Sequence, residues 1–290
     1  MMENTLIPEL DQLYSDVLGF KSTKSYRGLL DFVVKFPHIA PYNAILLYLQ
    51  YPGCRYALSA NEWRWKFNRT VKPGSTPLII LRTFGPVSFV FDIGSTEGED
   101  VPESILNPLK ASGYVTEGMM EQLVRNLTRE GIRFSMVDHA GGNGGLIAFG
   151  AIPETIIRLG TKNGKSVRIR TLFEIVVNSN SNLPSRYATI LHELGHFYCG
   201  HCPHPKANWL PIREELSLGQ VEFEAESVSW LLCQRLGIVG PSVRYLHGYL
   251  EHEHTIPVIS VDAVLKAVGK IERLLRSDIK PRKELLIEDE

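Results

Sequence analysis

Residues 184–200 read PSRYATILHELGHFYCG, and the patterns on both sides are easiest to interpret from this stretch. Pro184 suits the first turn of a helix and Gly200 suits a C-terminal cap, so we expect one helix here. β-rich segments precede it, and further helical patterns follow it. That order predicts an α+β fold.

His192 and His196 lie four residues apart within this stretch. Residues at that spacing share one face of a helix, so the two imidazoles can bind one metal ion. Glu193 lies beside the metal, where a carboxylate can take a proton from water. The HExxH pattern therefore predicts a zinc-dependent hydrolase, and the alternative is a chance match on a core helix.

A catalytic zinc takes three protein ligands and keeps one position open. The candidate for the third lies in SLGQVEFEAESVSWLLCQRLG, residues 217–237, where Ser217 and Gln220 form a capping-box pattern that predicts a helix from 218. Glu222 lies beside the apolar stripe of that helix and is our third ligand. Glu226, one turn later, could accept a hydrogen bond from a ligating histidine. The alternatives are an exchange of these two roles and a solvated acidic face.

Cysteines and histidines follow the HELGH helix in the segment Cys199-Gly-His-Cys-Pro-His204. They could form half of a structural zinc site, but no second Cys-x-x-Cys completes it. We expect a loop with reduced thiols that caps the site.

Glu224 lies on a different face of its predicted helix from Glu222 and Glu226. A later helical pattern contains four residues that could stabilise an oxyanion, and the sequence does not choose among them: Tyr245, His247, His252 and His254.

The first third of the chain contains helical patterns followed by β-rich runs. Helices are expected at roughly 6–19, 24–36, 41–50 and 59–67, the last with Ser59 as N-cap. The runs at 77–83 and 87–93 predict a hairpin around Gly85-Pro86. The polar stretch 94–104 is the candidate linker.

The second half begins with a helical pattern at 115–130. Strands are expected at 132–137, 146–152 and 167–177, forming an antiparallel sheet. The Gly-rich run at 141–145 is better explained as a hairpin than as a phosphate loop, because a strand follows it.

Composition limits the classes of protein that the chain can be. The 290 residues suggest two domains or one large one, and 44% apolar content permits a real core. A net charge of −1 means that any contact with nucleic acid must come from a local patch. Four cysteines do not make a disulfide scaffold, and no signal or membrane-spanning segment is apparent. We expect a cytoplasmic protein with no membrane partner.

The segment RYATILHELGHFYCGH, followed by Glu222-Phe-Glu-Ala-Glu226, resembles the glutamate-zincin metallopeptidases of the ImmA/IrrE type. The resemblance covers roughly residues 115–240. In that group the first Glu of an ExxA[DEN] helix is the third zinc ligand, which implies this role for Glu222. It also implies a zincin-like metallopeptidase domain, here 112–290, with one zinc ion per chain.

Residues 37–81 resemble the N-terminal domain of ArdC-type antirestriction proteins. A Tyr-Asn-Ala-x-Leu-Leu helix there precedes a run with Trp, Gly-Arg and Val, whereas Asn68 and 75–77 depart from that pattern here. The resemblance implies a small single-stranded-DNA-binding domain at 1–100 joined to the peptidase domain. The DNA-binding candidates are Tyr42, Asn43, Arg55, Trp65, Lys66, Arg69 and Lys72.

Charge and aromatic content partly support that implication. Residues 55–82 contain six basic residues and one acid, Glu62, with aromatic side chains interleaved. Cations that follow a backbone and rings that stack on bases are what sequence-tolerant single-strand binding requires. Trp63 and Phe67 are four apart and suit the core face of their helix, which leaves Trp65 as the exposed ring.

The lead hypothesis is a zinc metalloprotease that is tethered to a single-stranded-DNA-binding domain and cleaves an unidentified DNA-associated or regulatory protein. One alternative is a DNA-binding antirestriction protein whose peptidase site is weak or unused. The other is a regulatory protease that cleaves one repressor, as ImmA-like proteases do, without contact with DNA.

Overall fold

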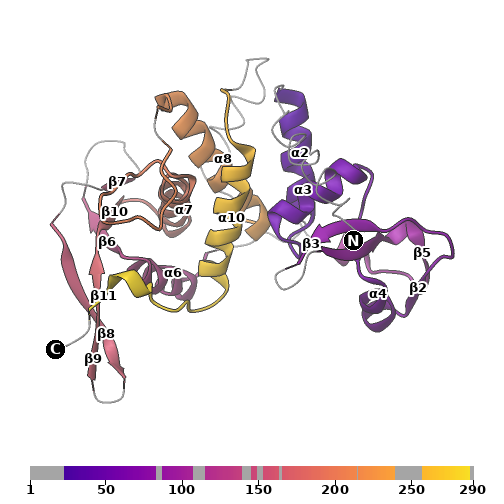
Figure 1. Ribbon diagram of the computed structural model, residues 1–290, viewed down its shortest axis with the longest axis horizontal. Coiled ribbons are helices and arrows are strands. Elements are labelled where there is room, and N and C mark those ends of the chain that lie inside the picture. The colour runs from indigo at the N-terminus through magenta and orange to yellow at the C-terminus, as the bar shows by residue number, and fades with distance from the viewer. Residues whose placement is uncertain are drawn as a thin grey trace, which may run out of the picture. The chain divides into compact units, whose positions relative to one another are not determined.

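The computed structural model describes residues 23–82, 87–106, 115–138, 145–148, 153–162, 165–213, 215–238 and 257–287. The expected helix at 6–19 and the candidates between 245 and 254 lie outside them. The chain divides into two compact units, each described below by itself. Helices and strands mix in both units (Figure 1), so the α+β class is confirmed. Among the described helices, none is long and apolar enough to cross a bilayer.

Unit 1 comprises Met1–Ser112, Gln234–Gly237 and Leu250–Ile256. A small antiparallel sheet has the strand order β1-β4-β3, and a second sheet pairs β2 with β5. The paired β3 and β4 confirm the expected pairing around Gly85-Pro86. The elements are α2 (Thr23–Lys35), α3 (Pro41–Gln50), β1 (Ala57–Leu58), α4 (Ala60–Phe67), β2 (Arg69–Val71), β3 (Leu78–Leu81), β4 (Val87–Asp92), η1 (Ile93–Ser95), β5 (Thr96–Gly98) and α5 (Glu103–Leu106).

Helix α4 forms where the capping signals predicted. Ser59 is its N-cap, and Glu62 completes a capping box with it. Trp63 is fully buried against Leu58 and Ile93, and its indole donates to the Phe91 carbonyl at 2.8 Å. The core role of Trp63 is therefore confirmed, and α4 is anchored through this ring.

The stretch 94–104 is not the plain linker that its polar sequence predicted. Strand β5 lies within it and pairs with β2 in antiparallel register, Arg69 opposite Gly98. The Arg69 guanidinium also donates to Thr96 Oγ1 and to the Thr96 carbonyl, both at 2.9 Å. Backbone pairing and this arginine give the polar segment a fixed place in unit 1.

Unit 2 comprises Gly113–Cys233, Ile238–Tyr249 and Pro257–Glu290. Its elements are α6 (Glu117–Arg129), β6 (Ile132–Val137), β7 (Gly145–Ala148), β8 (Thr155–Lys162), β9 (Lys165–Thr171), β10 (Phe173–Asn178), α7 (Leu183–Cys199), α8 (Leu218–Leu236), α10 (Val261–Arg276), η3 (Lys283–Leu285) and β11 (Leu286–Ile287). The last turn of α8 belongs to unit 1.

The sheet of unit 2 differs from the predicted antiparallel one. Its strand order is β6-β10-β7, and β10 runs parallel to β6 but antiparallel to β7. The expected hairpin at 141–145 is wrong, because β6 and β7 lie on opposite sides of β10. The expected strand at 167–177 is two strands in two sheets. It is interrupted where the N–H groups of Leu172 and Phe173 both donate to the Gly131 carbonyl.

Helix α7 spans Leu183–Cys199, as its sequence predicted. The Asn182 side chain caps its start, Pro184 lies in its first turn, and Gly200 ends it with φ 85°. The helix packs against β10, β7 and α10 (Figure 1), and nearly all of its second half is buried. α7 is therefore the central helix of unit 2.

Hydrogen bonds between residues far apart in the sequence hold unit 2 together. Asn126 on α6 is fully buried, and its amide nitrogen donates to the carbonyls of Leu274 at 2.7 Å and Ser277 at 2.9 Å. Its carbonyl oxygen accepts from the Ile279 N–H at 3.1 Å. One asparagine thus joins α6 to the end of α10 and to the chain beyond it.

Candidate metal centre

Helices α7 and α8 come into close contact at Gly195, a glycine within the HELGH motif. A Cβ atom at Gly195 would lie 2.9 Å from the Cα of Ala225 and 3.0 Å from its carbonyl oxygen. Contacts that short are forbidden, so only glycine permits this approach. Because Ala225 lies between Glu222 and Glu226, the approach places both carboxylates next to the histidines.

The predicted ligand atoms converge on one point. The Nε2 atoms of His192 and His196 are 3.1 Å apart, and the Glu222 carboxylate oxygens lie 3.5 Å from the first and 3.6 Å from the second. Two ligands bound at about 2.0–2.2 Å to a tetrahedral ion lie roughly 3.3–3.6 Å apart. Two imidazole nitrogens and one carboxylate oxygen are also a donor set that zinc uses. The residues present therefore fit a zinc ion.

Glu226 lies on the opposite edge of the His192 ring. Its Oε2 is 3.8 Å from His192 Nδ1, which is too long for a hydrogen bond, and both atoms are buried without a hydrogen-bond partner. Glu222 therefore faces the Nε2 side and Glu226 the Nδ1 side of the same ring. This placement separates the two glutamates in the way that their predicted roles require.

The Nε2 atoms of the two histidines are only 3.1 Å apart, so a positive charge on one ring lowers the pKa of the other. Burial lowers the pKa of His192, but hydrogen bonding to Glu222 and the charge of Glu226 outweigh burial and raise it to about 10. Burial and the positive charge of His192 lower the pKa of His196. Hydrogen bonding to His192 lowers the pKa of Glu222. One proton is thus held on His192, where a metal ion would displace it.

Glu193 is 6% exposed, and burial raises the pKa of its carboxyl group. The positive charge of His192 and a hydrogen bond from the Ile147 backbone act in the opposite direction. A raised pKa brings a carboxylate closer to the range in which it exchanges protons at neutral pH. Its environment thus suits a general base.

A cavity of about 330 Å³ opens onto these side chains. Strand β7 contributes Leu146 and Ile147 to its wall, and Leu146 is 48% exposed. Within the described part of unit 2, β7 pairs on one side only, with β10. The lining of the cavity therefore includes the predicted metal ligands, Glu193 and a strand edge that is unpaired among the described residues.

Two buried residues that lie behind His196, His201 and Glu224, were not predicted as part of the site. His201 Nδ1 lies 3.1 Å from His196 Nδ1, and His201 Nε2 lies 2.9 Å from Glu224 Oε2. Glu224 is fully buried, which is the opposite of a solvated face. The signal that could have indicated it is an arginine, Arg213, in the segment between the two helices. Its guanidinium binds both Glu224 oxygens.

The cysteines that follow the HELGH motif lie near a second group of possible metal ligands. All four are buried and free of disulfides. Cys199, His201 and Glu224 do lie close together, but Arg213 occupies the Glu224 carboxylate. His204 instead packs on Phe173 and accepts from the Lys206 N–H at 3.1 Å. Cys199 is the last residue of α7, and Cys202 lies in the loop that follows it.

The DNA-binding candidates of unit 1 fall into two groups. Asn43 pairs with both backbone groups of Leu81, at 2.9 and 3.0 Å, and Arg69 is held by β5, so both side chains are bound within the fold. Tyr42 is half-buried. These three side chains are therefore engaged within the fold and are poorer candidates for contact with DNA.

The remaining candidates are open to solvent. Trp65 is 81% exposed on α4, and Arg55 is exposed with no side-chain partner among the described residues. Lys66 pairs with Glu62 at 3.0 Å, and Lys72 donates to the Gly94 carbonyl at 3.0 Å. The exposure expected of Trp65 is confirmed.

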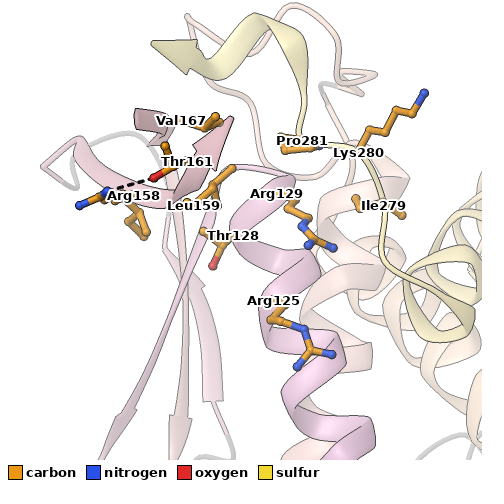
Figure 2. A pocket seen from close by; sticks show the side chains of 12 residues that line it. Arg125, Thr128, Arg129, Arg158, Leu159, Thr161, Val167, Ile279, Lys280 and Pro281 are labelled. Atoms are coloured by element: carbon orange, nitrogen blue, oxygen red, sulfur yellow. Dashed lines mark hydrogen bonds between the residues drawn. The ribbon is translucent and has the colours of Figure 1, made fainter. Parts of the chain in front are cut away.

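A larger cavity, about 520 Å³, lies away from the histidines, between α6, the β8–β9 hairpin and residues 279–281. Figure 2 shows the guanidinium groups of Arg125 and Arg129 on one side of it and that of Arg158 on the other. The ammonium group of Lys280 points away. Arg125 and Arg129 both pair with Asp278, at 3.7 and 2.9 Å, so these two cations are bound within the fold.

Comparison of the chain with protein-family models, with curated proteins and with solved structures finds no match.

Proposed function

We propose that the chain is a zinc-dependent peptide hydrolase of zincin type. His192, His196 and Glu222 would hold one zinc ion, and Glu193 would act as the base. The observation that carries the proposal is the convergence of the two Nε2 atoms and the two Glu222 carboxylate oxygens, at separations of 3.1 to 3.6 Å that are close to those around a tetrahedral ion.

Each side chain has a task in this reaction. Zinc, when bound, would polarise the scissile carbonyl and make water more acidic. Glu193 takes a proton from the attacking water and passes it to the leaving amine, since its buried carboxyl group has a raised pKa. Glu226 keeps the Nδ1 edge of His192 in a negative environment.

The open edge of β7 favours a polypeptide as substrate. An extended peptide can pair with a free strand edge through main-chain hydrogen bonds. Leu146 and Ile147 on that edge line the same cavity as His192 and Glu193. A peptide bound there would run past Glu193. The four free thiols suit a reducing compartment, and we propose the cytoplasm.

Metal content and cleavage, measured on the full chain, test this function. Purified protein should contain about one zinc per chain and cleave an unfolded protein such as casein. Glu193→Gln should keep the zinc and lose cleavage, because an amide cannot take the proton. The matched variant His196→Ala should lose both.

The two variants also separate the hypotheses. Full zinc retention in His196→Ala would contradict the metal site. Zinc binding without cleavage of any tested polypeptide would favour the alternative in which the peptidase site is unused.

We also propose, as a second function, that unit 1 binds single-stranded DNA. Trp65 supports this, because a tryptophan that is 81% exposed offers a stacking surface beside basic residues. Stacking of a base on an aromatic ring contributes about 1–3 kcal/mol. The joint presence of both functions is the arrangement that the ArdC resemblance implies.

Binding of the full chain to labelled oligo(dT) at several salt concentrations tests this second function. Trp65→Ala should weaken binding by roughly 5- to 150-fold. Arg55→Ala should reduce the log–log salt slope by about 0.7, the contribution of one phosphate contact. Arg69→Ala is unsuitable, because that side chain holds β5. Absence of binding at low salt would leave a regulatory protease without DNA contact.

A further inference from the structure

The atoms behind His196 form a continuous hydrogen-bonded chain. It runs from His196 Nδ1 to His201 Nδ1 at 3.1 Å, and from His201 Nε2 to Glu224 Oε2 at 2.9 Å. His201 and Glu224 have side chains that are 3% and 0% exposed, so water does not compete for these contacts. The chain therefore constrains where the protons lie.

Glu224 is fixed at the far end of this chain. Arg213 binds both of its oxygens, and the Ser260 N–H donates to Oε1 at 2.7 Å. A carboxylate that receives a guanidinium and a backbone N–H acts as an acceptor only. The proton shared with His201 must therefore be on His201 Nε2.

The remaining protons follow from the hydrogen-bonding capacity of imidazole. A neutral imidazole that donates from Nε2 has an unprotonated Nδ1. His201 Nδ1 is then an acceptor, and its partner at 3.1 Å, His196 Nδ1, must donate. His196 Nε2 is consequently unprotonated, and its lone pair faces His192 Nε2 at 3.1 Å and the Glu222 carboxylate.

We propose that His201 and Glu224 are positioning residues that hold His196 in its Nδ1–H tautomer, so that Nε2 is ready to bind a cation. The part that concerns metal affinity rests on the proposed zinc site. The tautomer itself does not, because it is a property of the metal-free chain. Arg213 and Ser260 act one step further away, by fixing Glu224.

The test is nitrogen-15 NMR of the histidine rings in metal-free full-length protein, together with zinc affinity measured against a competing chelator. In the wild type, the His196 signal should be that of the Nδ1–H tautomer. His201→Phe keeps a ring but removes the acceptor. It should abolish this preference and weaken zinc binding by about 10- to 100-fold, as loss of an outer partner does.

Two further variants make the result specific. His201→Asn restores an acceptor at the δ position and should keep the Nδ1–H tautomer. His204→Gln is the matched control on the same segment, because His204 bonds to Lys206 N and not to His196. It should leave both the tautomer and the zinc affinity unchanged.

A wild-type spectrum that shows His196 as the Nε2–H tautomer would overturn the proposal, even if a variant does not fold. So would a folded His201→Phe protein with unchanged tautomer and affinity. The Nδ1–H tautomer in a chain that binds no zinc would instead uphold the positioning role and refute the proposed metal function.

Discussion

Glu222 and Glu226 are one helical turn apart, yet the same substitution should affect them differently. Glu222→Gln replaces a carboxylate that faces both Nε2 atoms, so zinc affinity should fall by several orders of magnitude. Glu226→Gln changes only the Nδ1 side of His192 and should cost about 10- to 100-fold. Zinc titration against a chelator measures both. If Glu226→Gln strips the metal and Glu222→Gln does not, the two assignments must be exchanged.

Protonation of His192 should make zinc binding depend on pH. The raised pKa of His192, about 10, means that the metal-free chain keeps this proton throughout the neutral range. Zinc must displace it, so apparent affinity should increase with pH, by up to about tenfold per unit for one released proton. Calorimetry at pH 6 to 8 in buffers of different ionisation enthalpy counts the protons. Release of none would show that His192 is already neutral.

At the scale of helices, the crossing of α7 and α8 depends on Gly195. Gly195→Ala should push the backbone of Ala225 away, because a Cβ would lie 2.9 Å from its Cα. Such overpacking costs typically about 1–3 kcal/mol, and the shift should move Glu222 and weaken zinc binding. Urea unfolding and zinc titration measure the two effects.

Gly219→Ala is the matched control for this prediction. Gly219 lies in the first turn of α8, where an added Cβ meets no atom within 4 Å. Alanine there should stabilise the protein by up to about 1 kcal/mol. Equal behaviour of the two variants would show that the close approach does not position the site.

Local signals predicted the helices well, because caps are encoded within a few residues. The predicted signals Ser59, Pro184 and Ser217 with Gln220 all lie at helix starts. Strand order was not predicted, because β6 pairs with β10 and three other strands lie between them in the sequence. The close approach of His192 and His196 could be predicted from their spacing alone. Glu224 could not, because its partners His201, Arg213 and Ser260 meet only in the folded chain.

At the scale of the whole molecule, Asn126 should matter more than its surface neighbour. Asn126→Ala leaves the Leu274 and Ser277 carbonyls and the Ile279 N–H without this partner, at a cost of about 1–3 kcal/mol for each buried group left unpaired. Arg125→Ala removes only an exposed 3.7 Å pair with Asp278, worth about 0–1 kcal/mol. Thermal unfolding monitored by circular dichroism compares them. Similar unfolding temperatures for the two variants would refute the role of Asn126 in joining α6 to the end of α10.

The bonds of Asn126 also govern when this protein can finish folding during its synthesis. Ile279 follows Asn126 by 153 residues, and at roughly 5–20 residues per second a ribosome needs about 8–30 s to make that interval. Until then α6 lacks its partners at the end of α10, and α7 lacks α10. Glu224 likewise lacks its hydrogen bond from the Ser260 N–H until residue 260 has been made. A nascent chain therefore carries the HELGH helix before the residues that support it have been made. If the chain is the hydrolase proposed above, an unfinished chain on the ribosome should show no activity.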